Sequence, residues 1–469
     1  MNNREFREQA HKMVDWMADY LENISQYPVK SQVSPGEILE RLPAGPPVHS
    51  ESMDDIFSDF EKIIMPGITH WQSPKFFAYF PANSSYPSLL AEMLTATLGA
   101  QCMKWETSPA AAELEQSVLD WLRQMTGLPA DFSGVIQDSA SSSTLVALLT
   151  AREKATRYNI NAKGLRDYRF RVYCSSEAHS SIEKGVRIAG IGSENLVKIG
   201  VDEQYRMIPA LLEEKIREDI AHGFHPLCVV AAMGTTGSTS VDPLKEIALI
   251  CRRHNVWLHV DAAFAGSALI LPEYRWMSEG VEMVDSFVFN PHKWLFTNFD
   301  SSAYFVKDRQ ALVNTFSILP EYLRTATQGK VNDYCDWGIP LGRRFRALKL
   351  WFVLRHYGVE GLQQVLRSHL KLAAEFKQWL EKDGRFEILA PLTMNVVCFR
   401  YNPGNLTGDE LNRLNEDLMH RINRTGKMYL THTKLSGKFT LRMVIAQTNV
   451  VHANVEEAFH MIRDMAGQR

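Results

Sequence analysis

The chain has 469 residues, of which 45% are hydrophobic and 22% charged, and its formal net charge is −3. This length is too great for one simple core, so two or three structural regions are expected. The lack of a basic excess argues against nucleic acid or an anionic membrane surface as a partner.

The N-terminal region predicts helices with little core of their own. Residues 1–9 are polar and charged, without the apolar stretch of a signal peptide. Apolar residues recur at helical spacing over 6–24, a proline-rich connector covers 28–47, and a second helix is expected over 54–64. We expect this segment to pack on another surface, such as a partner subunit.

The middle of the chain alternates helical and strand-like patterns. Short apolar runs, rich in β-branched or aromatic residues, predict strands at 171–174, 228–232, 256–260 and 286–289. Helices are expected at 110–126, 142–158 and 243–254. This alternation favours an α/β fold with a mostly parallel sheet covered on both faces. A long helix over 362–381 then opens a small C-terminal α+β domain.

The cysteines and the hydropathy pattern indicate a cytoplasmic protein. No apolar run approaches the roughly 18 residues of a membrane span. The six cysteines are scattered without a CxxC pair, which is typical of free thiols rather than of disulfides or a metal site. We therefore expect neither a membrane partner nor a bound metal.

Two polar residues follow predicted strands and carry the main chemical signal. Lys293 lies in the segment Asn290-Pro291-His292-Lys293, just past the strand 286–289. Asp261 ends the strand before it, and open α/β sheets bind ligands at the carboxyl ends of strands. Each has an ordinary alternative, a solvated lysine or a turn aspartate. Lys293 follows Asp261 by 32 residues, which allows both to meet at one edge, where the amine would hold a cofactor aldehyde and the carboxylate a ring nitrogen.

Two further segments add an anion site and a ring contact. Residues 136–144 contain five hydroxyl side chains at a predicted helix start, where free backbone N–H groups and the helix dipole favour a phosphate. Ordinary serine capping explains only one or two of them. His179, in the segment 177–181, could stack on a planar cofactor, although a lone histidine is more often a cap or a core residue.

Together these segments resemble the group II pyridoxal-phosphate decarboxylases, and the closest similarity is to the aromatic-L-amino-acid decarboxylases. The resemblance covers nearly the whole chain and rests on ordered motifs. Those motifs are NPHKW (290–294), HVDAA (259–263), AHSS (178–181), HWQSP (70–74), AYFP (78–81), SPA (108–110), GTT (234–236) and LGRRFR (341–346).

The resemblance implies a type I fold like that of aspartate aminotransferase, with a mostly parallel seven-stranded sheet. It implies an N-terminal helical segment (1–85) packing on the partner subunit, a large cofactor-binding domain (86–360) and a small C-terminal α+β domain (361–469). It further implies a homodimer with active sites at the subunit interface.

The cofactor implied is pyridoxal 5'-phosphate, and the motif positions assign its contacts. Lys293 would form the Schiff base and Asp261 would pair with the pyridine nitrogen, while His179 and Ala263 would lie on the two faces of the ring. Thr236 would lie near Asp261. The phosphate contacts implied are Ala140, Ser141, Asn290 and His292.

The same resemblance assigns a proton donor and separates two reactions. Residues 325–337 are polar, weakly periodic and typical of a loop, and Tyr334 matches the family's catalytic tyrosine. Aldehyde-producing relatives tend to carry Phe there, or Asn in place of the stacking histidine. Tyr334 and His179 are both present, which favours decarboxylation to an amine.

The substrate is expected to be an aromatic L-amino acid: tryptophan, tyrosine, phenylalanine, DOPA or 5-hydroxytryptophan. Gly342 suggests room for a large ring, whereas Ala82 replaces a hydroxyl residue of the animal enzymes and weakens the case for a catechol. Gln101 and Met103 stand where those enzymes have apolar residues, and Gln101 could bond a ring substituent or face solvent. An aromatic, apolar cluster supplies the remaining predicted contacts, namely Trp71, Tyr79, Phe80 and Pro81.

Two alternatives remain open at this point. One is an aromatic acetaldehyde synthase, or another amino-acid decarboxylase, on the same fold. The other is a catalytically silent cofactor-binding homologue, against which the intact Lys293, Asp261, His179 and Tyr334 argue.

Overall fold

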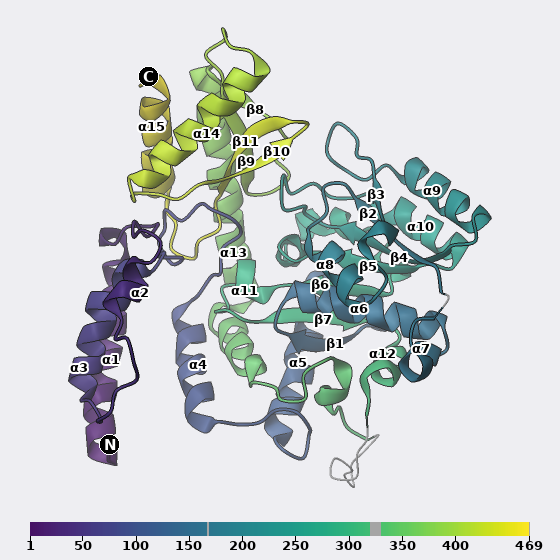
Figure 1. Cartoon of the computed structure of the whole chain (residues 1–469), viewed down its shortest axis with the longest axis horizontal. Helices are drawn as coiled ribbons and strands as arrows, with labels where there is room; N and C mark the ends of the chain where they lie inside the picture. Colours follow the sequence, from purple (N-terminus) through teal and green to yellow (C-terminus); the bar gives the residue numbers. More distant parts are fainter. Residues whose placement is uncertain (167, 319–329, 469) are drawn as a thin grey trace. The chain divides into compact units, whose positions relative to one another are not determined.

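A computed structural model describes residues 1–166, 168–318 and 330–468. The chain divides into two compact units (Figure 1). The first unit comprises residues 1–81, 369–389 and 395–469, and the second comprises residues 82–368 and 390–394. The three-part division predicted from the sequence, at residues 85 and 360, stays a prediction.

The second unit is built on a seven-stranded sheet in the order β1-β7-β6-β5-β4-β2-β3. Only β7 runs against its neighbours, β1 and β6, and the other adjacent pairs are parallel. This confirms the predicted α/β fold with a mostly parallel sheet. The strands are β1 (Ser133–Gln137), β2 (Phe170–Ser175), β3 (Leu196–Ile199), β4 (His225–Ala232), β5 (Trp257–Asp261), β6 (Ser286–Phe289) and β7 (Ser302–Val306).

Helices cover this sheet and explain why its central strands are almost wholly apolar. All four residues of β6 and seven of the eight in β4 are buried, as expected for strands covered on both faces. α6 contacts β4, β5 and β6. The helices of this unit are α4 (Tyr86–Leu98), α5 (Pro109–Thr126), α6 (Ala140–Ala155), α7 (Asn159–Lys163), α8 (Ser181–Ile188), α9 (Pro209–Ala221), α10 (Leu244–His254), α11 (Pro291–Trp294) and α12 (Arg309–Phe316).

The first unit combines the N-terminal helices with an antiparallel sheet in the order β10-β11-β9-β8. Residues 75–80 join this sheet region, because the backbone N–H of Phe77 donates to Tyr429 and that of Val444 donates to Phe77. The elements of this unit are α1 (Asn3–Glu22), α2 (Glu37–Arg41), α3 (Met53–Asp59), β8 (Phe386–Ile388), β9 (Val396–Tyr401), α14 (Gly408–Arg424), β10 (Thr431–Leu435), β11 (Lys438–Val444) and α15 (His452–Gly467).

The structure corrects several predicted boundaries. The helix expected over 362–381 is α13 (Arg346–Asp383), which begins 16 residues earlier and is interrupted at Gly358, whose φ is 62° and ψ 174°. A single glycine can interrupt a helix, but the helical region does not have to begin at that glycine. The helix expected over 54–64 leaves α-helical geometry after Asp59 and continues as a π-helical stretch, Phe60–Ile64. Among the described residues, no helix is long and apolar enough to cross a membrane.

Candidate active site

The parallel strands bring the predicted cofactor residues to one edge of the sheet. Since β7 is antiparallel to both β1 and β6, β1 points the same way as β2, β4, β5 and β6. The segments that follow β1, β2, β4 and β6 carry, in turn, Ser141, His179, Thr236 and Lys293, and Asp261 is the last residue of β5. These residues therefore emerge at the carboxyl ends of the strands, where open α/β sheets bind ligands.

Asp261 is held at the end of β5 by its neighbours in the sheet. It lies in register with Ala232 of β4 and Val288 of β6. Its carbonyl oxygen accepts the N–H of Met233 at 2.9 Å, and its Oδ1 accepts the N–H of Ala263 at 3.1 Å. The side chain is partly exposed, so an oriented carboxylate faces a ligand-accessible edge.

The turn after Asp261 packs tightly on β6. A Cβ atom added to Gly266 would lie 2.4 Å from the Cβ of Phe289, so only glycine allows this approach. The N–H of Asn290 donates to the carbonyl of Ala263 at 3.0 Å. The segment carrying Asp261 and the segment leading to Lys293 are therefore joined directly.

Lys293 stands on α11, a single turn that follows β6. Its N–H donates to the carbonyl of Asn290 at 2.9 Å, and its own carbonyl accepts the side-chain amide of Asn83 at 2.7 Å. The N–H of Asn83 also donates to the carbonyl of His292 at 3.1 Å. The backbone at Lys293 is thus fixed from both sides, and its side chain is only partly buried.

His179 lies within electrostatic range of both Asp261 and Lys293. Desolvation lowers the pKa of His179, the Lys293 ammonium lowers this pKa further, and the Asp261 carboxylate opposes the shift. Nδ1 of His179 accepts the backbone N–H of Ser181 at 3.2 Å and lies 2.8 Å from the Ser181 hydroxyl oxygen. A backbone N–H can only donate, so the ring is neutral here and carries its proton on Nε2.

Two buried histidines, one within β5 and one directly after β6, are neutral as well. Burial lowers the pKa of His292 to about 3, and its Nδ1 accepts the N–H of Ser301 at 2.9 Å. Its remaining proton is therefore on Nε2, which is a hydrogen-bond donor. Burial also lowers the pKa of His259 to about 4; its ring lies between the hydroxyl groups of Ser286 and Thr144.

An anion site is built at the start of α6. Ser139 caps the helix by accepting the N–H of Ser142 at 3.3 Å, and the amides of the first turn have no acceptor within the helix. Ser141 is exposed and shares with His179 a cavity of about 500 Å³ that is also lined by Lys184, Glu183 and Arg187, the last two forming an ion pair. The first-turn amides of α6 favour a negatively charged group.

Comparison with known proteins shows which family has this arrangement of residues. Residues 35–402 match the model of the pyridoxal-dependent decarboxylase conserved domain. The chain belongs to the pyridoxal-dependent decarboxylase family. It is a carboxy-lyase, and its cofactor is pyridoxal phosphate.

Relatives with two reaction types match over almost the full length. The chain is 46% identical to the aromatic-L-amino-acid decarboxylase of Rattus norvegicus, covering 99% of this chain and 98% of that protein. It is 45% identical to the phenylacetaldehyde synthase of Arabidopsis thaliana, covering 99% and 96%. The crystal structure of Oryza sativa TDC with PLP and tryptamine superposes with a TM-score of 0.96, at 36% identity over 99% of this chain and 98% of that one.

The residues at the sheet edge fit pyridoxal phosphate. The side-chain amide of Asn290 is buried at the predicted phosphate site, and its oxygen has no hydrogen-bond partner among the described residues. That oxygen can only accept, so the NH2 of this amide is the group suited to donate to a phosphate. The first-turn amides of α6 and the Nε2–H of His292 are donors suited to a phosphate. Lys293 and Asp261 supply the amine and the carboxylate that the aldehyde and the ring nitrogen require.

Tyr334, the predicted proton donor, lies in a buried environment. Its ring packs on Trp337 at 5.2 Å between centroids, and the guanidinium of Arg343 lies 5.0 Å from its centroid. Burial raises the pKa of Tyr334. Part of the loop predicted over 325–337, residues 325–329, lies outside the described residues.

Three of the predicted substrate residues, Gln101, Met103 and Gly342, lie in or beside the segment 335–343. Oε1 of Gln101 accepts the N–H of Arg343 at 2.7 Å, and a Cβ on Gly342 would lie 3.2 Å from the Gln101 Nε2. The carbonyl of Met103 accepts the N–H of Cys335 at 2.9 Å. Gln101 therefore bonds the protein's own backbone while its side chain stays exposed.

The other predicted substrate residues form an aromatic cluster in the first unit. Trp71 stacks on Tyr79 with 5.8 Å between centroids, and the Tyr79 hydroxyl lies 3.2 Å from that of Tyr429. Phe80 is half-buried and Pro81 buried. Ala82 begins the second unit, and the part that these residues take in substrate binding stays a prediction.

Several residues that shape the site escaped sequence reasoning. Asn83 fixes the backbone on both sides of Lys293, yet one asparagine in a serine-rich turn gives no such signal. His259 belongs to the HVDAA motif, but only the folded structure shows that it is completely buried and within electrostatic range of Asp261. Arg343 belongs to the LGRRFR motif, and the sequence alone indicates no role for it.

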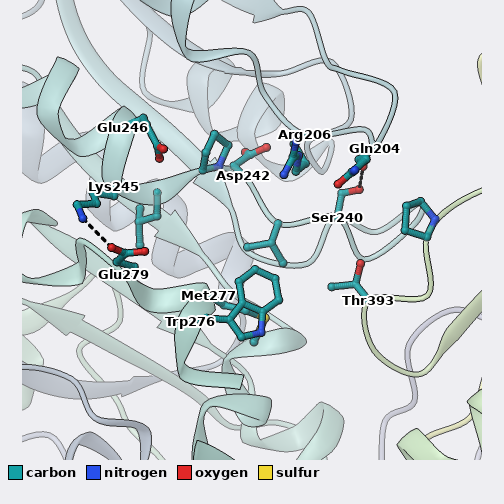
Figure 2. A pocket seen from close by; sticks show the side chains of 14 residues that line it. Gln204, Arg206, Ser240, Asp242, Lys245, Glu246, Trp276, Met277, Glu279 and Thr393 are labelled. Carbon is teal, nitrogen blue, oxygen red and sulfur yellow. Dashed lines mark hydrogen bonds and ion pairs between the residues drawn. The ribbon is translucent and has the colours of Figure 1, made fainter. Parts of the chain in front are cut away.

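A second cavity lies beside the turn after β4 (Figure 2). Its volume is about 230 Å³, and none of the predicted site residues lines it. Asp242 in its wall accepts the N–H of Met207 at 2.7 Å and that of Ala232 at 2.8 Å, and Lys245 pairs with Glu279 across its rim. Asp242 thereby holds the turn that carries Thr236, and the cavity itself has no catalytic group of the edge site.

Proposed function

We propose that the chain decarboxylates aromatic L-amino acids to the corresponding amines and CO2. This proposal rests mainly on one observation: Lys293, Asp261 and the neutral His179 lie at the same edge of the sheet. The chain that carries them belongs to the pyridoxal-dependent decarboxylase family. Pyridoxal phosphate, when bound, supplies an electron sink for the electrons left when CO2 departs.

Residues of the chain would hold the cofactor and orient its ring. Lys293 holds the cofactor aldehyde through its amine, and the backbone bonds around it fix where that amine emerges. Asp261, oriented by the N–H of Ala263, keeps the ring nitrogen protonated. His179 would contact the ring, and it would do so in its neutral form because its Nδ1 accepts the N–H of Ser181.

Tyr334 is the proposed donor of the proton that replaces CO2 on the α-carbon. Burial raises its pKa, so the phenol is protonated at neutral pH and has a proton to donate, although burial also makes it a weaker acid. A positioned acid contributes roughly 10²–10⁴-fold to such a step. The retention of both Tyr334 and His179 supports an amine product.

A second candidate function is aromatic acetaldehyde synthesis. It is favoured by the 45% identity to the phenylacetaldehyde synthase of Arabidopsis thaliana. That reaction consumes O2 and water and releases aldehyde, CO2, ammonia and hydrogen peroxide, so its products differ from those of simple decarboxylation.

The test is a product assay on a panel of tryptophan, tyrosine, phenylalanine, DOPA and 5-hydroxytryptophan. The proposal expects equimolar amine and CO2 for at least one of them, with no O2 consumed. Aldehyde, ammonia and peroxide as the main products would establish the second candidate instead. Lys293→Ala is the matched inactive control, and the panel also ranks the substrates.

We further propose a homodimer in the cytoplasm, with active sites at the subunit interface. No residue of α1 is buried in the single chain, although Phe6 and Val14 are apolar and exposed; a partner surface would cover them. All six cysteines are free and buried, which suits a reducing compartment. Light scattering of the purified protein tests the dimer, for which a mass near 107 kDa, about twice the 53.4 kDa chain, is expected.

A further inference from the structure

Arg343 forms a buried ion pair with Glu115 of α5. Its two terminal nitrogens donate to the two carboxylate oxygens at 3.0 and 2.7 Å. The side chains of Arg343 and Glu115 are only 6% and 3% exposed. Burying two charges is costly, and a buried ion pair is often no more stabilising than an apolar pair. Stability alone therefore does not explain why these two side chains are paired.

The pair is anchored to β1, the strand that leads into the anion site. Oε1 of Glu115 accepts the N–H of Ile136 at 2.9 Å, and the Arg343 guanidinium donates to the carbonyl of Ile136 at 2.7 Å. Arg343 and Glu115 are 228 residues apart in the chain. A rigid point is therefore fixed two residues before Asp138, at the entrance to α6.

On its other side, Arg343 holds the residues predicted to select the substrate. Its N–H donates to Oε1 of Gln101 at 2.7 Å, and its carbonyl accepts the N–H of Cys102 at 3.0 Å. Its guanidinium lies over the ring of Tyr334, 5.0 Å from the centroid. Gly342 precedes it directly, so one arginine touches or adjoins three of the predicted substrate and proton-transfer residues.

These residues also enclose a space. A cavity of about 370 Å³ is lined by Tyr334, Gly342 and Arg343, and by Gln137, Asp138 and Ser142 at the end of β1 and the start of α6. Ser142 follows Ser141 of the anion site. A shift of the Arg343 backbone or guanidinium would therefore move one wall of a cavity whose lining includes Ser142, the neighbour of Ser141 in the first turn of α6.

We infer that Arg343, fixed by Glu115, is a positioning residue that sets reaction and substrate specificity. It does so by holding Gln101, Gly342 and Tyr334 in one fixed arrangement relative to β1. This inference rests on the proposed function, because it assigns Tyr334 the protonation step. Lysine cannot replace arginine here, since it lacks the planar fork that makes two bonds to Glu115 and lies over the ring.

The test compares Arg343→Lys, Glu115→Gln and a control in the holoenzyme. The control is Arg400→Lys, because Arg400 is another buried arginine that pairs with a glutamate, Glu387, at 2.6 Å, but in the first unit. Each protein is assayed for bound cofactor by absorbance, for thermal stability, for kcat and KM on the aromatic panel, and for the amine-to-aldehyde ratio.

Arg343→Lys is expected to keep its cofactor, lose roughly 10- to 100-fold in kcat/KM, release more aldehyde per amine and change the ranking of tryptophan against phenylalanine. Glu115→Gln should shift the same readouts in the same direction by less. Arg400→Lys should leave the product ratio and ranking unchanged, whatever its melting temperature.

A purely structural ion pair gives a different pattern. In that case Arg343→Lys and Glu115→Gln melt earlier but keep the wild-type product ratio and substrate ranking, which overturns the inference. If Arg343→Lys does not fold, Glu115→Gln decides by the same readouts. A wild-type enzyme that makes no aromatic amine refutes the proposed function itself, so the two failures are distinguishable.

Discussion

Replacing His259 with glutamine should remove a specific part of the protein's acid sensitivity. His259 is fully buried on β5, with Nδ1 2.9 Å from the Ser286 hydroxyl and Nε2 3.4 Å from that of Thr144. Burial lowers its pKa from 6.5 to about 4, against the opposing effect of the Asp261 carboxylate. Glutamine retains hydrogen-bonding groups but cannot titrate.

The sign and size of the effect follow from this pKa. Because the folded-state pKa is lower than the unfolded one, the unfolded chain takes up the proton first as pH falls below 6.5. The contribution of His259 to stability is therefore complete above pH 6.5 and is lost as pH falls toward 4. At 1.36 kcal/mol per pH unit, about 2 kcal/mol is lost by pH 5.

The measurement is urea unfolding of wild type and His259→Gln at pH 7.5 and pH 5.0. The wild type should be the more stable at pH 7.5, and its advantage should shrink by about 2 kcal/mol at pH 5.0. His292 and His369, which are also buried, remain in both proteins and cancel in the difference. His49→Gln, at an exposed position, should show no such change. An advantage that stays constant between the two pH values would refute the reasoning.

Three substitutions at the site have distinct expected outcomes. Asp261→Asn should bind cofactor but lower kcat by roughly 10² or more, because the ring nitrogen loses its anionic partner; unchanged kcat would remove Asp261 from this role. Tyr334→Phe should retain cofactor and shift products toward aldehyde, which chromatography of both products measures; an unchanged amine yield would contradict its role as acid. Gly266→Ala should destabilise the fold by about 1–3 kcal/mol, because its Cβ would lie 2.4 Å from that of Phe289; a melting temperature equal to wild type would show that this contact can relax.

The centre of the fold could be predicted because its strands are buried on both faces. The runs 228–232, 256–260 and 286–289 are almost purely apolar, and β4, β5 and β6 occupy nearly the same residues. Asp261 and Lys293 stand out because a charged residue directly after such a run needs a partner. Alternating strands and helices then place both at the same edge.

The outer strands could not be predicted in the same way. β1 begins with Ser133 and Gly134, and β3 contains Lys198 in only four residues, so neither shows a continuous apolar run. They are the two edge strands of the sheet, and each pairs with a neighbouring strand on one side only. Their short, mixed sequences are indistinguishable from those of loops by periodicity alone.

The environment of the predicted substrate residues depended on long-range pairing. Gln101 is exposed, which agrees with one of the two expected alternatives, and its oxygen also bonds the backbone of Arg343, 242 residues further along the chain. The Arg343–Glu115 pair spans 228 residues. Local sequence patterns do not indicate which residues pair across such long separations in the chain, so these contacts appear only in the folded structure.

The most direct test of the account is the covalent location of the cofactor. The holoenzyme is reduced with borohydride, digested and mapped by mass spectrometry for the lysine that carries the pyridoxyl group. The account predicts a label on Lys293, with loss of both label and turnover in Lys293→Ala. A label on another lysine, or a retained label in Lys293→Ala, would contradict it.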